Sequence, residues 1–168
     1  MHFHGKNHVG TNGIFPAYGC SMPPTPSLLL IDDSSGEREL FREALLRTEL
    51  EVMLFAEQDA EAALRFLLHR ASLGVPPSVV LLDWHLRRWG GQEFLRQLRA
   101  HPSIATTPVV VLSTSDSVVD VSAAYANGAN AYVVKPNTFD ELVRCIHTMC
   151  RFWVSCNVSP RLVEESRC

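Results

Sequence analysis

The chain has 168 residues, a formal net charge of -3 and 46% hydrophobic residues, which suits one globular domain with a sizeable core. The composition has no basic excess of the kind that nucleic-acid-binding domains carry, and no apolar run approaches the about 20 residues that cross a bilayer. The five cysteines are an odd number without a framework spacing, so they argue against a secreted disulfide scaffold and indicate the cytoplasm.

Residues 1–26 have the composition of a disordered leader, rich in glycine, proline and polar side chains. His2, His4 and His8 could bind a metal, but no acidic residue in this stretch completes a ligand set. Met22 offers an alternative start for the natural protein, which the mass of its N-terminal peptide would test.

Five short apolar runs follow the leader, and each is suited to a buried strand. Runs of this kind that end in a polar residue are typical of parallel strands covered by helices on both faces. The predicted strands are Ser27–Ile31, Glu51–Ala56, Val79–Asp83, Pro108–Ser113 and Ala131–Val134.

Helical patterns lie between and after these strands. Ser34 and Glu37 fit a capping box, in which the hydroxyl and the carboxylate each satisfy a free backbone donor. Asp59 and Thr138 are suited to cap later helices. Ser117–Asn127 has a short, alanine-rich helical pattern, and a further helix lies between the third and fourth strands.

This alternation with short connections favours parallel neighbours and right-handed crossovers. The predicted fold class is α/β: a flavodoxin-like, doubly wound, five-stranded parallel sheet in the order 2-1-3-4-5, with five helices. We assign the domain to residues 27–153, with the last helix ending near Phe152 or Trp153, and treat residues 154–168 as a C-terminal tail.

Polar side chains stand at the ends of four predicted strands. Asp32 and Asp33 follow the first strand, Asp83 and Ser113 end the third and fourth, and Lys135 follows the fifth. In open parallel sheets, ligands bind at the carboxyl ends of the strands, and the predicted order places these ends side by side. Taken singly, Asp83 could be a cap or turn residue, and Ser113 and Lys135 could have no role. Their placement together at one edge of the sheet favours a shared functional site.

The chemistry of this set indicates phosphoryl transfer. Carboxylates that share a pocket repel one another, and their oxygen atoms suit Mg²⁺. The metal and Lys135 would bear the charge of a phosphoryl group as it moves onto Asp83, since a carboxylate nucleophile can form an aspartyl phosphate. Ser113 could donate a hydrogen bond to the attached group.

With these residues in place, the chain resembles the receiver domain of bacterial response regulators over roughly Ser27 to Trp153. The resemblance rests on Asp32-Asp33, Leu-Leu-Asp83, Val-Leu-Ser113 and Tyr132-Val-Val-Lys135-Pro136. It implies that Asp83 is the phosphoacceptor, that Lys135 pairs with the phosphoryl group, and that Ser113 and Tyr132 form a switch pair. It also implies a cis bond before Pro136 and a Mg²⁺ site made by Asp32, Asp33, Asp83 and the main-chain carbonyl of His85.

The segment Arg151-Phe152-Trp153-Val154 is similar to single-domain regulators partnered with phytochromes. This similarity implies a sensor histidine kinase of the phytochrome type as partner. It also implies a homodimer through the face of the fourth helix, fifth strand and fifth helix, extended by Phe152 and Trp153. The alternative is that both aromatic residues only seal the core beneath the last helix.

The loop after Asp83 departs from the family pattern. Arg87 stands where receivers usually have proline, and with Arg88 it makes this loop basic beside an acidic site. His85 occupies a position that in receivers helps to set the rate of phosphoryl hydrolysis, and Thr114 is bulkier than the small residue often found there.

The predicted function is that of a stand-alone response regulator that accepts a phosphoryl group on Asp83 and signals through altered protein contacts. Its only predicted catalysis is its own phosphotransfer and dephosphorylation. About fifteen residues follow Trp153, too few for a helix-turn-helix module, so we expect a downstream protein or phosphotransfer partner, no DNA and no membrane. The alternatives are a receiver-like interaction module that is not phosphorylated and a phosphohydrolase with an aspartate nucleophile.

Overall fold

The computed structural model describes residues 25–158. The predicted leader, apart from its last two residues, the alternative start at Met22 and the end of the tail lie outside the described residues. The elements along the chain are β1 (Ser27–Ile31), α1 (Ser35–Leu46), β2 (Met53–Glu57), α2 (Ala60–Ser72), β3 (Val79–Asp83), α3 (Gly91–Ala100), β4 (Val109–Ser113), α4 (Val118–Ala126), β5 (Ala131–Val134), α5 (Phe139–Cys150) and a π-helical segment, η1 (Arg151–Cys156).

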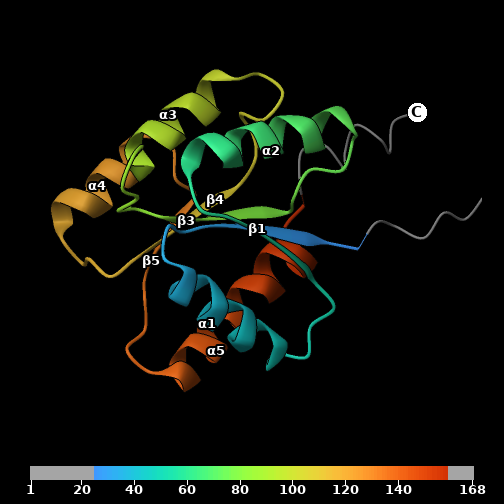
Figure 1. The fold of residues 1–168 in the computed structure, drawn as a ribbon, viewed down its shortest axis with the longest axis vertical. Helices are drawn as coiled ribbons and strands as arrows, with labels where there is room; N and C mark the ends of the chain where they lie inside the picture. Colours follow the sequence, from blue (N-terminus) through green and yellow to red (C-terminus); the bar gives the residue numbers. More distant parts are fainter. Residues whose placement is uncertain (1–24, 159–168) are drawn as a thin grey trace, which may run out of the picture.

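The strands form one parallel sheet in the order β2-β1-β3-β4-β5, which confirms the predicted fold class. Figure 1 shows the sheet edge-on, with α2, α3 and α4 on one face and α1 and α5 on the other. Both faces of the central strands are therefore covered. This explains why β1 and β4 are buried at every residue and are apolar at every position except a terminal serine.

The core consists of two clusters of apolar side chains, one on each side of the sheet. The cluster beneath α2, α3 and α4 includes Trp84 and Leu86, which follow β3 directly. Gly91, at the start of α3, makes room for this arrangement, because a Cβ atom there would lie 2.6 Å from Cε3 of Trp84. The chain leaving β3 is thus anchored by packing.

Three predicted helix caps are present, but the capping box is only half formed. Ser34, Asp59 and Thr138 each accept a hydrogen bond from a backbone N–H in the first turn of their helix. The Glu37 carboxylate lies 3.6 Å from Nζ of Lys135 instead, while the Ser34 N–H donates to Asp32. The ammonium group of Lys135 attracts the Glu37 carboxylate away from the position that a capping box requires.

The last α-helix ends before the predicted Phe152 or Trp153, but helical turns of another kind continue beyond them. The α-helix ends at Cys150, and the chain continues through η1 to Cys156. Trp153 and Val154 pack against the cluster of α1 and α5, which accounts for the continued turning of the backbone. Phe152 is 52% exposed and contacts the Trp153 ring edge-on, with centroids 4.9 Å apart. No described helix is long and apolar enough to cross a membrane.

Candidate functional site

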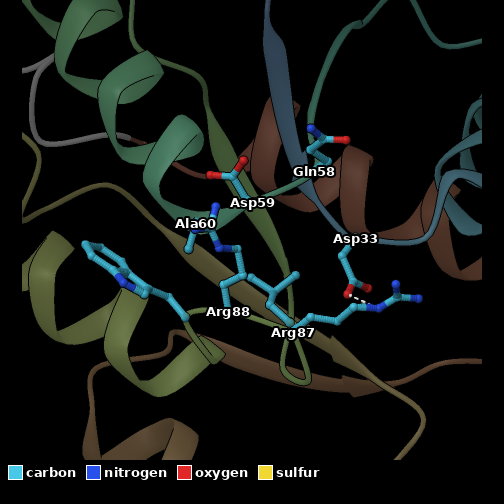
Figure 2. Close-up of a pocket in the computed structure, with 8 residues that line it drawn as sticks. Asp33, Gln58, Asp59, Ala60, Arg87 and Arg88 are labelled. Atoms are coloured by element: carbon cyan, nitrogen blue, oxygen red, sulfur yellow. Dashed lines mark ion pairs between the residues drawn. The ribbon is translucent and has the colours of Figure 1, made fainter.

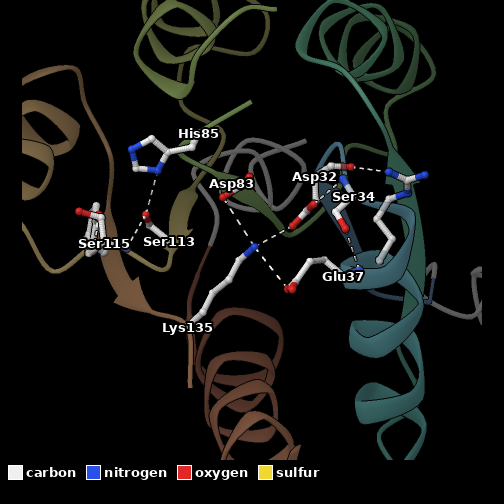
Figure 3. Close-up of polar contacts among 10 residues, drawn as sticks. Asp32, Ser34, Glu37, Asp83, His85, Ser113, Ser115 and Lys135 are labelled. Atoms are coloured by element: carbon white, nitrogen blue, oxygen red, sulfur yellow. Dashed lines mark hydrogen bonds and ion pairs between the residues drawn. The ribbon is translucent and has the colours of Figure 1, made fainter. Parts of the chain in front are cut away.

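The predicted site residues meet at the carboxyl edge of the sheet (Figure 3). Asp83 is the last residue of β3 and Ser113 the last of β4, while Asp32 and Lys135 directly follow β1 and β5. The backbone N–H of Lys135 donates to the carbonyl of Ser113 at 2.7 Å, which holds the chain leaving β5 against the end of β4. Sheet pairing, rather than local sequence, therefore positions these side chains.

Lys135 is the central cation of the site. Its Nζ atom donates to Oδ2 of Asp32 at 2.8 Å and lies 3.6 Å from a carboxylate oxygen of Asp83 and of Glu37. Burial lowers the pKa of Lys135, but the hydrogen bond to Asp32 and the charges of the three carboxylates outweigh burial and raise it. Lys135 is therefore a permanent positive charge at neutral pH.

Asp83 lies in a less favourable electrostatic environment. Burial raises the pKa of Asp83, and the neighbouring charges of Asp32 and Asp33 raise it further. The ammonium of Lys135 and a hydrogen bond from the backbone of His85 act in the opposite direction. The net result is a carboxylate whose negative charge is incompletely balanced by the protein.

Asp32, Asp33 and Asp83 can together hold a metal ion. Each offers a carboxylate oxygen, and these three oxygens lie within 4.8 Å of one another. Oδ2 of Asp33 is buried and has no hydrogen-bond partner among the described residues. Three converging carboxylates, one with an unsatisfied oxygen, are the donor set that a hard divalent cation takes, so the residues present fit such an ion.

Ser113 belongs to a polar network that extends toward α4. Its fully buried hydroxyl lies 3.4 Å from Nδ1 of His85, whose Nε2 lies 3.6 Å from Oδ2 of Asp120. Asp120 also accepts hydrogen bonds from Nε1 of Trp84 at 3.2 Å and from the Ser115 hydroxyl at 2.6 Å. This carboxylate connects the chain after β3 with the chain after β4.

Tyr132 lies beside this network rather than against Ser113. Its hydroxyl donates to the carbonyl of Ser115 at 2.8 Å, in the segment between β4 and α4. The predicted partners Ser113 and Tyr132 are thus joined through Ser115, whose N–H donates to the Ser113 hydroxyl at 3.1 Å.

One expectation at the site is wrong. The resemblance implied a cis bond before Pro136, but no peptide bond in residues 25–158 is cis. Trans is the lower-energy isomer even for a bond to proline. Lys135 already reaches Asp32 and Asp83 with its trans bond, so these contacts do not require the cis form.

Sequence reasoning missed two contributors to the site. Asp120 lies in the first turn of α4, where an acidic residue is ordinarily explained by the helix dipole. The sequence marks Arg87 as unusual but does not reveal its partner: Nε of Arg87 lies 3.0 Å from Oδ2 of Asp33. The only available signal was a basic loop next to an acidic site.

Residues 28–147 match the response regulator receiver domain family, and the chain belongs to this family. Among curated relatives, the probable methanogenesis regulatory protein FilR2 of Methanothrix harundinacea is 34% identical over 79% of this chain and 86% of its own length. Response regulator Rcp1 of Synechocystis is 30% identical over 78% of this chain and 90% of its own length.

Solved structures have the same fold. The phosphorylated cyanobacterial phytochrome response regulator RcpA has a TM-score of 0.73 and 26% identity, over 81% of this chain and 99% of its own. A structure of Rcp1 in its Mn²⁺-bound form has a TM-score of 0.69 over 80% of this chain and 99% of its own. The chain is a receiver-domain signalling protein with an acidic pocket of the type that binds a divalent metal.

Proposed function

We propose that this protein is a phosphorylation switch in which Asp83 accepts a phosphoryl group from the phosphohistidine of a sensor histidine kinase. The observation that carries the proposal is the geometry around Asp83: a carboxylate at a strand end, 3.6 Å from the ammonium of Lys135 and within a cluster of three acids. In the reaction, a carboxylate oxygen of Asp83 attacks phosphorus, the bond from phosphorus to the imidazole nitrogen breaks, and an acyl phosphate forms.

Lys135 and the acids have distinct roles in this proposal. Lys135, already held by Asp32, bears negative charge that develops on the phosphoryl oxygens. Asp32, Asp33, Asp83 and the main-chain carbonyl of His85 would hold Mg²⁺, which when bound supplies a further positive charge to those oxygens. Ser113 lies at the end of the neighbouring strand, where its hydroxyl can donate to the attached phosphoryl group.

Phosphorylation would change contacts on the face formed by α4, β5 and α5. Movement of Ser113 toward the phosphoryl group would disturb Ser115, and Ser115 is bound to both Tyr132 and Asp120. Several large apolar side chains on this face are exposed: Val118, Val119, Tyr125 and Val134. We propose that this face, with Phe152, binds a downstream protein or a second copy of the chain. Trp153 contributes mainly to the core.

The kinase is proposed to be of the phytochrome type, since RcpA is a phytochrome response regulator and shares the fold over nearly its full length. A cytoplasmic location agrees with the free thiols of Cys145, Cys150 and Cys156. In this proposal the protein catalyses its own phosphotransfer and dephosphorylation and turns over no other substrate.

Intact-mass measurement after incubation with Mg²⁺ and acetyl phosphate tests the function directly. The wild type should gain one phosphoryl group, and Asp83→Asn should gain none. Asp116→Asn is a matched control, because Asp116 is an exposed acid in the segment after β4 and should leave the gain unchanged. A gain by Asp83→Asn would place the phosphoryl group elsewhere. No gain by the wild type from acetyl phosphate or from any histidine kinase supplied would favour a receiver-shaped interaction module.

A further inference from the structure

The loop between β3 and α3 places a guanidinium group at the rim of the acidic cluster. Figure 2 shows the Arg87 side chain extended toward Asp33, with the ion pair drawn between them. The two residues line a pocket of about 220 Å³, together with Arg88 and the start of α2. Nε of Arg87 and Oδ2 of Asp33 are 3.0 Å apart, and the Arg87 side chain is 83% exposed while that of Asp33 is 20% exposed.

The Arg87 guanidinium and the Asp33 carboxylate form an ion pair without a hydrogen bond. Oδ2 of Asp33 is buried and lacks a hydrogen bond within residues 25–158, so the guanidinium approaches it without hydrogen-bond geometry. Ion pairs with one highly exposed partner are weak, because water screens the charges and the long side chain loses freedom. Arg87 therefore balances the charge of Asp33 without using up the bonding capacity of its oxygen.

Asp33 belongs to the three-acid cluster that fits a divalent cation, and its buried Oδ2, which lacks a hydrogen bond among the described residues, is suited to be one of the ligand atoms. Mg²⁺ held there would place a second cation beside Arg87 and would keep several of its waters. A guanidinium 3.0 Å from Oδ2 of Asp33 would be repelled by such an ion and would compete with its water shell for space.

We propose that Arg87 is a displaceable counterion for Asp33: it neutralises the acidic cluster in the metal-free protein and competes with Mg²⁺ for the same carboxylate oxygen. The inference rests on the proposed function, in which Asp33 is a metal ligand. Leu86 is buried in the core next to Arg87, so the exchange is confined to the exposed side chain and leaves the backbone anchored. The strength of Mg²⁺ binding is thereby set partly by a residue that does not bind the metal.

Arg88 provides a matched control for this proposal. It is adjacent in sequence, is exposed and lines the same pocket. In the described part of the chain, an ion pair to Asp33 is found for Arg87 and not for Arg88. Arg87→Gln and Arg88→Gln remove the same charge from the same loop, and only the first removes the contact to Oδ2 of Asp33.

The experiment is isothermal titration of the full chain with Mg²⁺ for the wild type, Arg87→Gln, Arg88→Gln and Asp33→Asn, at about 0.1 M salt. Arg87→Gln should lower the Kd for Mg²⁺ by about two- to fivefold, which is the range expected from exposed ion pairs, and Arg88→Gln should change it by less than about 1.5-fold. In the wild type, the NMR signal of the Arg87 Nε–H group should shift on addition of Mg²⁺.

The outcomes separate this inference from the proposed function. Equal Kd values for the wild type and Arg87→Gln would overturn the competition and leave the metal site intact. An equal decrease in the Kd for Mg²⁺ in Arg87→Gln and Arg88→Gln would also overturn the competition, because the total charge of the loop would then explain the effect. If neither the wild type nor Arg87→Gln binds Mg²⁺, or if Asp33→Asn binds as tightly as the wild type, the proposed metal site itself fails, and the inference with it.

Discussion

Replacement of Lys135 by methionine tests whether this cation holds the acidic edge of the sheet together. The side chains of Lys135 and Asp32 are only 15% and 4% exposed, so their 2.8 Å pair is largely shielded from water. Removing one partner of a buried pair typically costs about 3–5 kcal/mol, because the other charge is left without compensation. Asp32 keeps a hydrogen bond from the Ser34 N–H, so we expect a loss near the lower end of this range, about 3 kcal/mol.

The assay is thermal and urea unfolding in the presence of EDTA. A loss of about 3 kcal/mol should lower the Tm by about 10 °C for a domain of this size. Saturating Mg²⁺ should restore part of the loss, because the ion supplies positive charge to the same carboxylates and binds only the folded state. Arg42→Met is the control: its pair with Glu39 is exposed, so the change should stay within about 0.5 kcal/mol.

If Lys135→Met unfolded at the wild-type temperature in EDTA, Lys135 would not be the cation that holds these carboxylates together. The pH dependence gives a second check. The pKa of Lys135 is raised above its ordinary value of 10.5, so its contribution should be constant below pH 10.5 and lost as the pH rises through the higher folded-state value. The difference in unfolding free energy between the two proteins should therefore narrow above about pH 10.5. A constant difference would contradict this assignment.

Three further predictions concern other parts of the molecule. Because the folded-state pKa of Asp83 is raised above 3.8, its ionised form costs stability at neutral pH. Asp83→Asn should therefore raise the Tm at pH 7 in EDTA, with the gain disappearing below about pH 3.8, and a lower Tm at pH 7 would contradict this. Gly91→Ala should destabilise the fold by about 1–3 kcal/mol in urea unfolding, because its Cβ would overlap Trp84, and wild-type stability would exclude that overlap. Burial and Cys145 raise the pKa of the Cys150 thiol to about 11, so peptide mapping after brief alkylation at pH 8 should find Cys156 modified and Cys150 protected, and equal modification would show that Cys150 is accessible.

Local sequence patterns were enough to predict the architecture and the polar residues at the carboxyl edge of the sheet. Each strand is a short apolar run and each predicted cap is a single residue, so these features depend on local patterns. The parallel order then followed from short connections and the known handedness of crossovers. Because the strand ends of a parallel sheet share one edge, the sequence already predicts that Asp32, Asp83, Ser113 and Lys135 lie close together.

The pairing of these side chains depends on contacts between residues that are far apart in the sequence. Lys135 and Asp32 are 103 residues apart, and Trp84 and Asp120 are 36 apart, so no local pattern encodes either contact. Glu37 illustrates the difference: its spacing from Ser34 favours a capping box, but its carboxylate lies near the ammonium of Lys135, which follows β5. Arg87 pairs with Asp33 because the fold brings the two opposite charges close together, and not because of their positions in the sequence. Which charged side chains form ion pairs depends on their distance in space and on their burial. Both are set only when the helices pack on the sheet.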